Sequence, residues 1–404
     1  MKPRVMVVHQ GRRDEYEVAL ALREGGADVT LVTSGYPGPR LSALLARIPL
    51  RLARKLAARR TPKLADIHVV GALAAEMYSR FLGLFLGESY ALERIDAGLA
   101  AQALRVSAVD SFEVVVCYNY NAFRIFNSLR GSHARLVLFQ CHPHPLYVRD
   151  ELTRLSRAGL LPATNGEKEF SYSQAYQAML VAEPALADQV LCASSHTRKS
   201  LIAHGICESA ISVVPYGVGD RFRDSAPKAG TMNRLEILFV GQFVHRKGLS
   251  VIAQVIQALD FPFRITLVGR GGREVDPAQF KCAPRGELRV LWDVAPDTLV
   301  ALYRQAAVFL FPSFVEGFAH VVLEAMLSGC VPVVSTATCG PDVIAHGSDG
   351  FVFDSSDVRG YVAALNEIFH GGHVAEIGAR ARLAAERYTW ATFRNELARV
   401  VMNG

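Results

Sequence analysis

The stretch PSFVEGFAHVVLEAM, Pro312–Met326, follows the apolar run VFLF and precedes VPVVS at residues 331–335. These letters predict a strand, a loop, a helix and a second strand, the repeating unit of a parallel sheet covered by helices. Glu316 lies in the predicted loop, and Glu324 lies about two helical turns beyond the helix start. The unpaired N–H groups at that start, near residues 318–321, can hold a phosphate. On spacing alone, a solvated loop carboxylate and a helix-surface carboxylate are the simpler interpretation.

Composition limits the classes of protein that the chain can represent. Its 404 residues suffice for two domains, and a hydrophobic share of 50% is ample for sizeable cores. The net charge of +6 suits anionic substrates or membrane surfaces, but the chain lacks the dense basic runs with aromatics that indicate nucleic acid. Seven cysteines without a CxxC pair fit the reduced thiols of a cytoplasmic protein. The start, MKPRVMVVHQG, predicts a strand rather than a signal peptide, and we expect no transmembrane helix.

The strand and helix signals stop and restart once, which predicts two α/β domains. A polar stretch with Pro and Gly, GDRFRDSAPKAGTMNR, separates the two series and predicts a linker. We therefore expect a Rossmann-like domain over residues 1–219, a linker over 220–234 and a second Rossmann-like domain over 235–389. Doubly wound sheets bind ligands at the carboxyl ends of their strands, so the expected site is a cleft between the two halves.

Two further stretches place glycines at predicted strand ends. In LFVGQFVHRKG, residues 238–248, Gly241 ends a strand, and Arg246 and Lys247 precede a helix. Cations in this position suit a diphosphate, although exposed Arg–Lys pairs are common on protein surfaces. In ITLVGRGG, residues 265–272, the glycines allow close approach of a ligand to the backbone, but a simple turn explains them equally well.

The longer pattern PSxxEGFxxxxxEAMxxGxxPVV resembles the signature of the retaining glycosyltransferases of glycosyltransferase family 4, with its E-x7-E pair. The resemblance implies two Rossmann-like domains facing across a central cleft, the GT-B fold. It also implies that Glu316 contacts the sugar of a nucleotide-sugar donor and that Glu324 contacts the donor ribose. Ala319 stands where the family often has glycine, and we expect little effect because its N–H group stays available.

The resemblance extends to the other donor-side stretches. Lys247 matches the family's phosphate-binding lysine in a VGRLxxxKG element, whereas Gln242 stands at the position of the family's arginine. We hypothesise that Arg246 supplies the missing cation. Residues 290–306, VLWDVAPDTLVALYRQA, resemble the segment that encloses the base but do not identify the base. The resemblance implies this set of donor-binding residues: Gly241, Gln242, Gly269, Gly271, Val294, Gly317, Phe318, Ala319, His320 and Glu324.

The N-terminal half contains fewer residues that match a specific motif of the family. Gly11, after the first predicted strand, matches the family's glycine loop near the donor phosphate and the acceptor. In FQCHPHP we prefer His142 as the family's active-site histidine, with His144 as the second choice, and a purely structural strand-end histidine stays open. Two His at this spacing form a poor zinc site, so we expect no metal. The last segment, 390–404, resembles the family's final helix, which packs back on the first domain.

The segment Leu41–Arg60 mixes leucines with five arginines and one lysine. Such a segment suits a helix lying on anionic lipid, or a helix whose leucines face the protein while its arginines are solvated.

These features predict a retaining hexosyltransferase that moves a sugar from a nucleotide-diphosphate sugar to a hydroxyl of a glycan, glycolipid or other glycoconjugate precursor. No DxD triplet occurs, so we expect metal-independent catalysis by Glu316, Lys247, Arg246 and His142, without a cofactor. The alternatives are a nucleotide-sugar epimerase of the same fold and a non-catalytic relative that binds nucleotide sugars. The expected place is cytoplasmic or peripheral on the inner face of the membrane. The letters do not identify the donor, the acceptor or the linkage.

Overall fold

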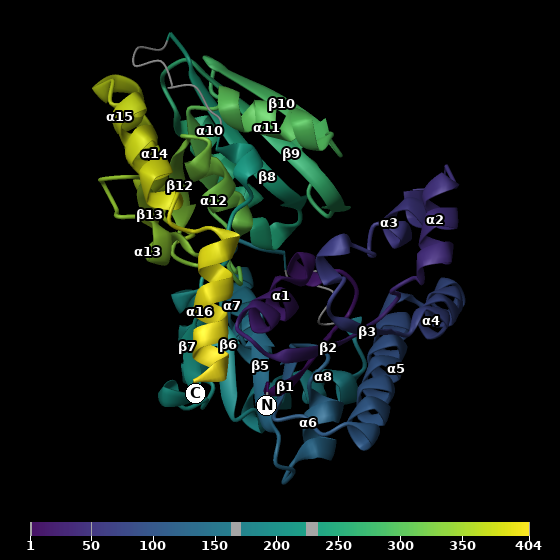
Figure 1. The fold of residues 1–404 in the computed structure, drawn as a ribbon. Helices are drawn as coiled ribbons and strands as arrows, with labels where there is room; N and C mark the ends of the chain where they lie inside the picture. Colours follow the sequence, from purple (N-terminus) through teal and green to yellow (C-terminus); the bar gives the residue numbers. More distant parts are fainter. Residues whose placement is uncertain (1, 50, 163–170, 224–232, 404) are drawn as a thin grey trace.

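Two parallel sheets, one in each half of the chain, form the framework of the molecule (Figure 1). The computed structural model describes residues 2–49, 51–162, 171–223 and 233–403. The first sheet has seven strands in the order β3-β2-β1-β4-β5-β6-β7, and the second has six in the order β10-β9-β8-β11-β12-β13. In both sheets the strand order reverses beside the first strand, as in a doubly wound nucleotide-binding fold. The predicted fold of two Rossmann-like units is therefore confirmed.

The strands of the first sheet are short and apolar, and all except the edge strands β3 and β7 are almost wholly buried, as expected for a parallel sheet covered on both faces. They are β1 (Arg4–His9), β2 (Asp28–Thr33), β3 (His68–Gly71), β4 (Val114–Tyr118), β5 (Arg135–Gln140), β6 (Gln189–Cys192) and β7 (Ile211–Val213). The helices of this half are α1 (Glu17–Glu24), α2 (Pro39–Arg47), α3 (Arg51–Ala57), α4 (Leu73–Leu86), α5 (Glu88–Val109), α6 (Phe123–Leu129), α7 (Pro145–Arg157), α8 (Gln174–Ala182) and α9 (Ser195–Ala203).

The second half repeats this arrangement with shorter connections. Its strands are β8 (Leu235–Phe243), β9 (Phe263–Arg273), β10 (Gly286–Trp292), β11 (Val308–Phe311), β12 (Val331–Ser335) and β13 (Phe351–Phe353). Its helices are α10 (Leu249–Ala258), α11 (Pro296–Gln305), α12 (His320–Leu327), α13 (Gly340–Val343), α14 (Val358–Gly371) and α15 (Val374–Ala385), and α16 (Trp390–Met402) ends the chain.

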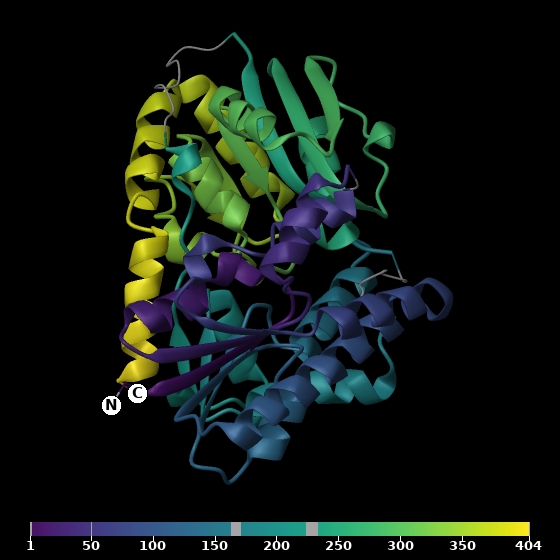
Figure 2. The ribbon, with the colours of Figure 1, turned by 45° about the vertical axis from the view of Figure 1, so that its right-hand side comes forward.

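The last helix belongs by contact to the first half. α16 packs along α1, and Arg394 binds Glu17 at 2.6 Å and Glu24 at 2.7 Å. Figure 2 shows the two termini close together beside the first sheet. We propose the boundaries 1–219 and 235–389 for the domains, with 390–404 returning to the first. Within the expected linker 220–234, residues 224–232 lie outside the described residues.

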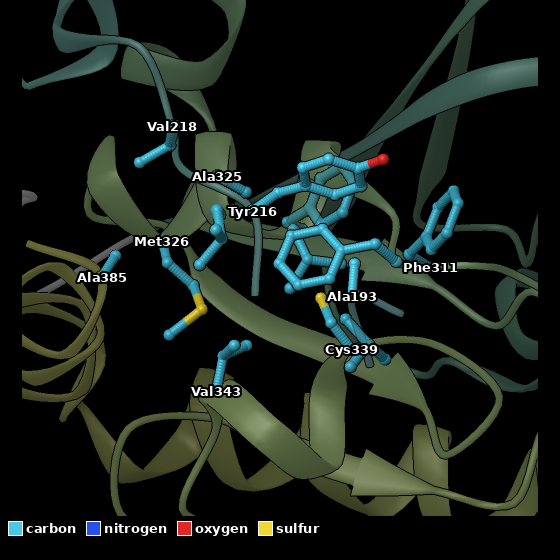
Figure 3. Close-up of a cluster of buried hydrophobic side chains, with 14 of the residues drawn as sticks. Ala193, Tyr216, Val218, Phe311, Ala325, Met326, Cys339, Val343 and Ala385 are labelled. Carbon is cyan, nitrogen blue, oxygen red and sulfur yellow. The ribbon is translucent and has the colours of Figure 1, made fainter. Parts of the chain in front are cut away.

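A shared apolar cluster joins the two halves. Tyr216 and Val218, at the end of the first half, lie with Met326 of α12, Val343 of α13 and Ala385 of α15 (Figure 3). One core cluster includes buried side chains of both sheets. This burial of apolar surface favours the observed arrangement of the halves.

Several elements differ from the sequence prediction. The pattern over residues 374–401 predicts a long helical tail, which the structure divides into two helices, α15 and α16, with a break at residues 386–389. The glycines of 265–272 lie inside the long strand β9 instead of in a turn after a short strand. The basic segment forms two short helices, α2 and α3. None of the helices in the described ranges combines the length and the apolarity needed to cross a bilayer.

Candidate functional site

The loops after β8 and β11 meet where the strand order of the second sheet reverses. The first loop carries Arg246 and Lys247, and the second carries Glu316. The Lys247 ammonium forms a salt bridge with Glu316 Oε1, and the Arg246 guanidinium lies 3.6 Å from the same oxygen. The Ser313 hydroxyl donates a hydrogen bond to this oxygen at 2.7 Å. Three residues predicted from two separate stretches are thus brought together.

The charge state of Glu316 follows from these neighbours. Burial alone would raise its pKa, but the Lys247 ammonium and the Arg246 guanidinium lower the pKa below its ordinary value. Glu316 is 9% exposed and is therefore a buried carboxylate at neutral pH. Two cations around one anion leave this loop pair with a net positive charge, which can attract a diphosphate.

Glycine positions let these loops approach closely. Gly248 has φ +72°, and a Cβ there would lie 2.0 Å from the carbonyl oxygen of Pro312. A Cβ at Gly317 would lie 1.7 Å from the carbonyl oxygen of Cys141, which belongs to the other half of the chain. The carbonyl oxygen of Gly317 also accepts a hydrogen bond from the Ser194 hydroxyl at 2.5 Å. The Glu316–Gly317 loop is therefore in direct contact with the first domain.

The start of α12 lies at the same contact between the two halves of the chain, which we call the seam. Ala319 precedes the helix with φ +73° and ψ +70°, a left-handed conformation that disfavours a residue with a Cβ. Phe318 and His320 both pack on the ring of Tyr216, with ring centroids 5.5 and 4.5 Å away. The predicted helix start at residues 318–321 is thus placed against Tyr216, at the end of the N-terminal half.

Glu324, the second glutamate of the pattern, has a different environment. It lies on α12 and accepts a hydrogen bond from the Tyr303 hydroxyl of α11 at 3.1 Å. Burial raises its pKa. Among the described residues, Glu324 contacts Tyr303, whereas Glu316 contacts Lys247, Arg246 and Ser313, so the two carboxylates have separate environments.

The other residues of the expected donor-binding set lie in the last parts of β8 and β9 and just after β10. Gly241 and Gly269 pack against aromatic rings. A Cβ at Gly269 would lie only about 3 Å from ring atoms of Phe243 and Trp292, so the position has no space for a larger residue. Gly271 has φ +63° with open space around it. Val294 lies next to Asp293, whose N–H donates a hydrogen bond to the carbonyl oxygen of Gly269 at 2.9 Å.

Gln242 lies apart from the cation pair. Its side chain is exposed, and its Cβ is 3.3 Å from the point where a Cβ on Gly272 would stand. Arg246, in contrast, points at Glu316. The geometry is consistent with the hypothesis that Arg246 supplies the cation that Gln242 lacks, a role that we retain as a proposal.

A cavity of about 380 Å³ opens between the two halves beside this cluster. Arg246, Val315 and Glu316 line it from the second half, and the ends of β4 and β5 with α7 and α8 line it from the first. The lining includes apolar side chains such as Leu146, Val148, Leu180 and Val181. A ligand here would be in reach of both domains.

The two candidate histidines differ in their position relative to the cavity. His142 lines it, whereas His144 is not among the lining residues. His144 is 2% exposed, stacks on His204 at 4.6 Å and caps α7 by accepting a hydrogen bond from the Leu146 N–H at 3.3 Å. Burial lowers the pKa of His144 to about 4, so it is neutral at pH 7. The structure thus assigns His144 a capping contact, and His142 stays the better candidate.

Sequence reasoning missed Gln140, the last residue of β5, which lies two positions before His142. Gln140 lines the cavity and is 2% exposed, and its Nε2 group donates to the carbonyl oxygen of His142 at 2.8 Å. Its Oε1 atom is buried without a hydrogen-bond partner among the described residues. An unpaired buried acceptor is costly unless a ligand supplies a donor. The FQCHPHP stretch contained this residue, but a glutamine at a strand end carries little signal by itself.

The loop after β1 also reaches the seam. Gly11 has φ +67°, and its N–H donates to the Ser34 hydroxyl at 3.0 Å. Three residues later, Asp14 accepts a hydrogen bond from the Tyr216 hydroxyl at 2.9 Å. The pair is 202 positions apart in the chain, so no local pattern could reveal it.

Metal ligands are not clustered in the part of the chain that the structure describes: no group of three or more His, Cys, Asp or Glu side chains could hold an ion there.

Comparison with known proteins gives the context for this geometry. The family model described as glycosyl transferases group 1 matches residues 220–387. A sulfoquinovosyl transferase of Arabidopsis thaliana is 31% identical over 227 residues, which are 50% of this chain and 42% of the relative. An O-antigen chain mannosyltransferase of Escherichia coli is 32% identical over 162 residues, or 38% of this chain and 42% of the relative. The chain thus matches less than half the length of these relatives.

Solved structures share the whole architecture at low sequence identity. Sucrose-phosphate synthase from Thermosynechococcus elongatus superposes with a TM-score of 0.67 at 12% identity, covering 100% of this chain and 99% of that one. Anabaena HepE in complex with UDP and glucose gives a TM-score of 0.62 at 15% identity, covering 100% of both chains. At these identities the likeness establishes the fold alone.

Proposed function

Since this chain belongs to the group 1 glycosyl transferases, we propose that it transfers a hexose from a nucleoside-diphosphate sugar to a hydroxyl group of an acceptor. One observation carries the proposal: Lys247, Arg246 and Glu316 converge at the strand-order reversal of the second sheet, beside a cavity that both halves line. This is the position at which doubly wound sheets bind nucleotides.

Lys247 and Arg246 stabilise the diphosphate leaving group in this proposal. Fixed cations in a partly buried site oppose the charge that develops as the bond from phosphate to sugar breaks. The N–H groups at the start of α12 add a second source of positive potential. Before donor binds, Glu316 balances the cations; with donor bound, its carboxylate accepts hydrogen bonds from sugar hydroxyls. Glu324, next to Tyr303, holds the ribose.

The acceptor occupies the cavity on the other side of the sugar. Gln140 Oε1 accepts a hydrogen bond from an acceptor hydroxyl, and His142 lies at the same wall. The acceptor is a glycan, glycolipid or other glycoconjugate precursor. The name of one relative, a phosphatidyl-myo-inositol mannosyltransferase of Mycolicibacterium smegmatis that is 31% identical over 183 residues, supports including lipid-linked acceptors. The basic segment Leu41–Arg60 is proposed to contact an anionic membrane surface.

The reaction is proposed to retain the anomeric configuration. The acceptor oxygen bonds to the anomeric carbon on the face that the diphosphate leaves, and the acceptor proton passes to a phosphate oxygen of the departing group. Contact between the halves, as at Gly317, keeps water from the sugar during this step. Because HepE is described in complex with UDP-glucose, UDP-sugars are the first donors to test.

The test uses the whole chain and a panel of UDP-, GDP- and dTDP-sugars without acceptor. A transferase releases nucleotide and free sugar slowly, whereas an epimerase interconverts the sugars and a non-catalytic relative leaves them intact. Glu316→Gln is expected to reduce nucleotide release by roughly a hundredfold, because it removes a buried group that contacts the reacting sugar. Glu376→Gln, an exposed carboxylate on α15, is the control. Interconversion of the sugar, or release unchanged by Glu316→Gln, would contradict the proposal.

A further inference from the structure

Helix α4 turns its apolar side outward. Its exposed apolar residues recur at helical spacing, with 44% to 79% of each side chain accessible. We call them the α4 stripe: Met77, Tyr78, Phe81, Leu84 and Phe85. Figure 1 shows α4 at the outer edge of the first half, beyond α5. A contiguous apolar surface of this kind marks a binding surface in a folded protein.

The orientation of α4 is fixed by the polar residues on its inner side. Glu76 is 1% exposed and accepts hydrogen bonds from Arg59 at 2.7 and 3.1 Å and from Arg80 at 2.7 Å. The arginines lower the pKa of Glu76 against the opposing effect of burial, so it is ionised. Rotating the stripe inward would remove a buried carboxylate from its two cations, which is strongly unfavourable.

The inner side is also closely packed. Ser79 is 4% exposed, and a Cβ at Gly83 would lie 2.6 Å from the Cβ of Ala91 on α5. Large side chains therefore fit on the outer side of α4 and not against α5. The exposure of the stripe is a property of the packed structure.

The chain next to α4 is strongly basic. Residues 34–65 contain no Asp or Glu but contain the cations Arg40, Arg47, Arg51, Arg54, Lys55, Arg59, Arg60 and Lys63. On α2, Arg40 and Arg47 flank the exposed leucines Leu41 and Leu44. The Arg59–Glu76 pair attaches this basic segment to α4. Arg59 and Lys63 pair with carboxylates of the first half, whereas Arg40, Arg47, Arg54 and Lys55 are exposed. Apolar side chains among exposed cations suit an anionic lipid surface better than a neutral one.

A cation of α5, Arg94, packs on tyrosine rings at one end of the stripe. The Arg94 guanidinium of α5 lies 6.0 Å from the ring centroid of Tyr78 and 5.8 Å from that of Tyr90. Phe81 and Phe85 pack edge to face at 5.4 Å. Tyrosine rings beside arginine are favourable at the boundary between lipid headgroups and acyl chains, because one end is apolar and the other polar.

The stripe is connected to the acceptor cavity. At the turn after α4, the Ser89 and Ser171 hydroxyls are 2.7 Å apart, and Glu93 accepts hydrogen bonds from the Ser173 N–H and hydroxyl at 2.8 and 2.9 Å. Ser173 caps α8, whose Gln174 and Gln177 line the cavity. An acceptor delivered beside α4 would thus meet the wall of the cavity.

From these observations we infer that the α4 stripe docks on an anionic lipid bilayer, inserting into its headgroup region while the exposed cations Arg40, Arg47, Arg54 and Lys55 face the lipid phosphates. The docking surface consists of the α4 stripe with the basic segment that Arg59 attaches to it. It presents the acceptor cavity to molecules anchored in the same bilayer. Only this last step rests on the proposed function; the docking itself does not require catalysis.

The test is co-sedimentation of the whole chain with vesicles of phosphatidylcholine alone or mixed with phosphatidylglycerol. We expect binding to the mixed vesicles that weakens as salt is raised. The double variant Phe81→Ser/Phe85→Ser should bind at least about tenfold more weakly, since two inserted rings are lost. The matched control is Val109→Ser/Leu383→Ser, which removes side chains that are 87% and 70% exposed elsewhere.

A tryptophan at the stripe reports contact directly. Phe85→Trp should show a blue shift of its emission on addition of mixed vesicles, because the indole enters a less polar environment. Val109→Trp should show no shift. Both positions are exposed, and the substitution at Phe85 changes only its surface contact with Phe81.

Three outcomes would overturn the inference. These are no binding of the wild-type chain to mixed vesicles at low salt, equal weakening by the stripe and control variants, and a stripe variant that only dissociates a dimer seen by light scattering. The last outcome would assign the stripe to a second copy of the chain. Nucleotide release from a nucleotide sugar in solution, measured on the same samples, keeps this result separate from the proposed function.

Discussion

Ala319 shows how one backbone position connects sequence to site. It precedes α12 at the point where the proposed donor phosphate lies, and it has φ +73°. The sequence predicted that its N–H group would remain available whether the residue is alanine or glycine. The local strain was not predictable, because the left-handed conformation depends on how the loop meets Cys339, whose N–H donates to the carbonyl oxygen of Phe318 at 2.9 Å.

Ala319→Gly should stabilise the protein. A left-handed residue with a Cβ destabilises the folded state by roughly 1–2 kcal/mol. The greater conformational freedom of glycine in the unfolded chain offsets part of this, so we expect the free energy of unfolding to rise by about 0.5–1 kcal/mol. Thermal unfolding of both proteins measures the effect. Ala325→Gly, in the buried interior of the same helix, should lose stability instead. A lower unfolding temperature for Ala319→Gly would show that the strain is absent.

His142 and His144 illustrate what residues alone leave open. Both follow β5, and the letters FQCHPHP fit either choice. The distinction comes from α9, whose Ser200 accepts the His144 N–H at 2.9 Å and whose end stacks His204 on His144. These contacts join parts of the chain that no local pattern relates, whereas the glutamates and Lys247 lie in long, specific stretches.

At the scale of elements, the apolar runs were good predictors and the outer helices were not. β11 and β12 coincide with the apolar runs VFLF and VPVVS, because each is a buried apolar run ended by a turn. α4 was not predicted, because its apolar stripe faces solvent and its position depends on the Arg59–Glu76 pair. α16 follows a break that the helical tail did not reveal.

Helix α5 supports the loops of the first switch point through a buried carboxyl. Asp96 accepts a hydrogen bond from Asn121 Nδ2 at 3.0 Å, and Asn121 Oδ1 accepts the Gln10 N–H at 3.1 Å. Arg124 lies 3.6 Å from Asp96. Burial raises the pKa of Asp96 from 3.8 to about 6.

This pKa predicts a pH dependence of stability. The folded chain binds the Asp96 proton more tightly than the unfolded chain, so the contribution of Asp96 to the free energy of unfolding decreases as pH rises from about 4 to about 6. Asp96→Asn removes this titration. The stability of the variant relative to the wild type should therefore increase by roughly 1–2 kcal/mol between pH 5 and pH 7. Denaturant unfolding at both pH values checks this, and parallel curves for the two proteins would rule it out.

At the scale of the whole molecule, the site depends on contact between the halves. Glu316 and Lys247 come from the second sheet, while His142 and Gln140 come from the first. The Gly317 backbone touches Cys141, and α16 returns from the second half to α1. The fold class could be predicted because each half repeats one pattern; the seam could not, since it depends on pairs such as Asp14 and Tyr216.

Gly317→Ala should hold the halves apart. A Cβ there would overlap the Cys141 carbonyl oxygen, so the loop can no longer seat against the first domain. We expect nucleotide release from the donor to fall by about tenfold or more, because misplacement of the site by about 1 Å is costly. Small-angle scattering should show a more open particle. Gly38→Ala, where no atom lies within 4 Å of a new Cβ, is the control; equal activity of the two variants would mean that the seam is not needed.

The central claim is that Lys247, with Arg246 and Glu316, binds the diphosphate of a nucleotide sugar. Isothermal titration calorimetry of UDP, GDP and dTDP against the wild-type chain, Lys247→Ala and Lys281→Ala tests it most directly. The account predicts that one nucleotide binds the wild type and the Lys281→Ala control equally, while Lys247→Ala loses about tenfold to a hundredfold in affinity through the missing charge-assisted hydrogen bond. Binding of that nucleotide to Lys247→Ala with undiminished affinity would contradict it.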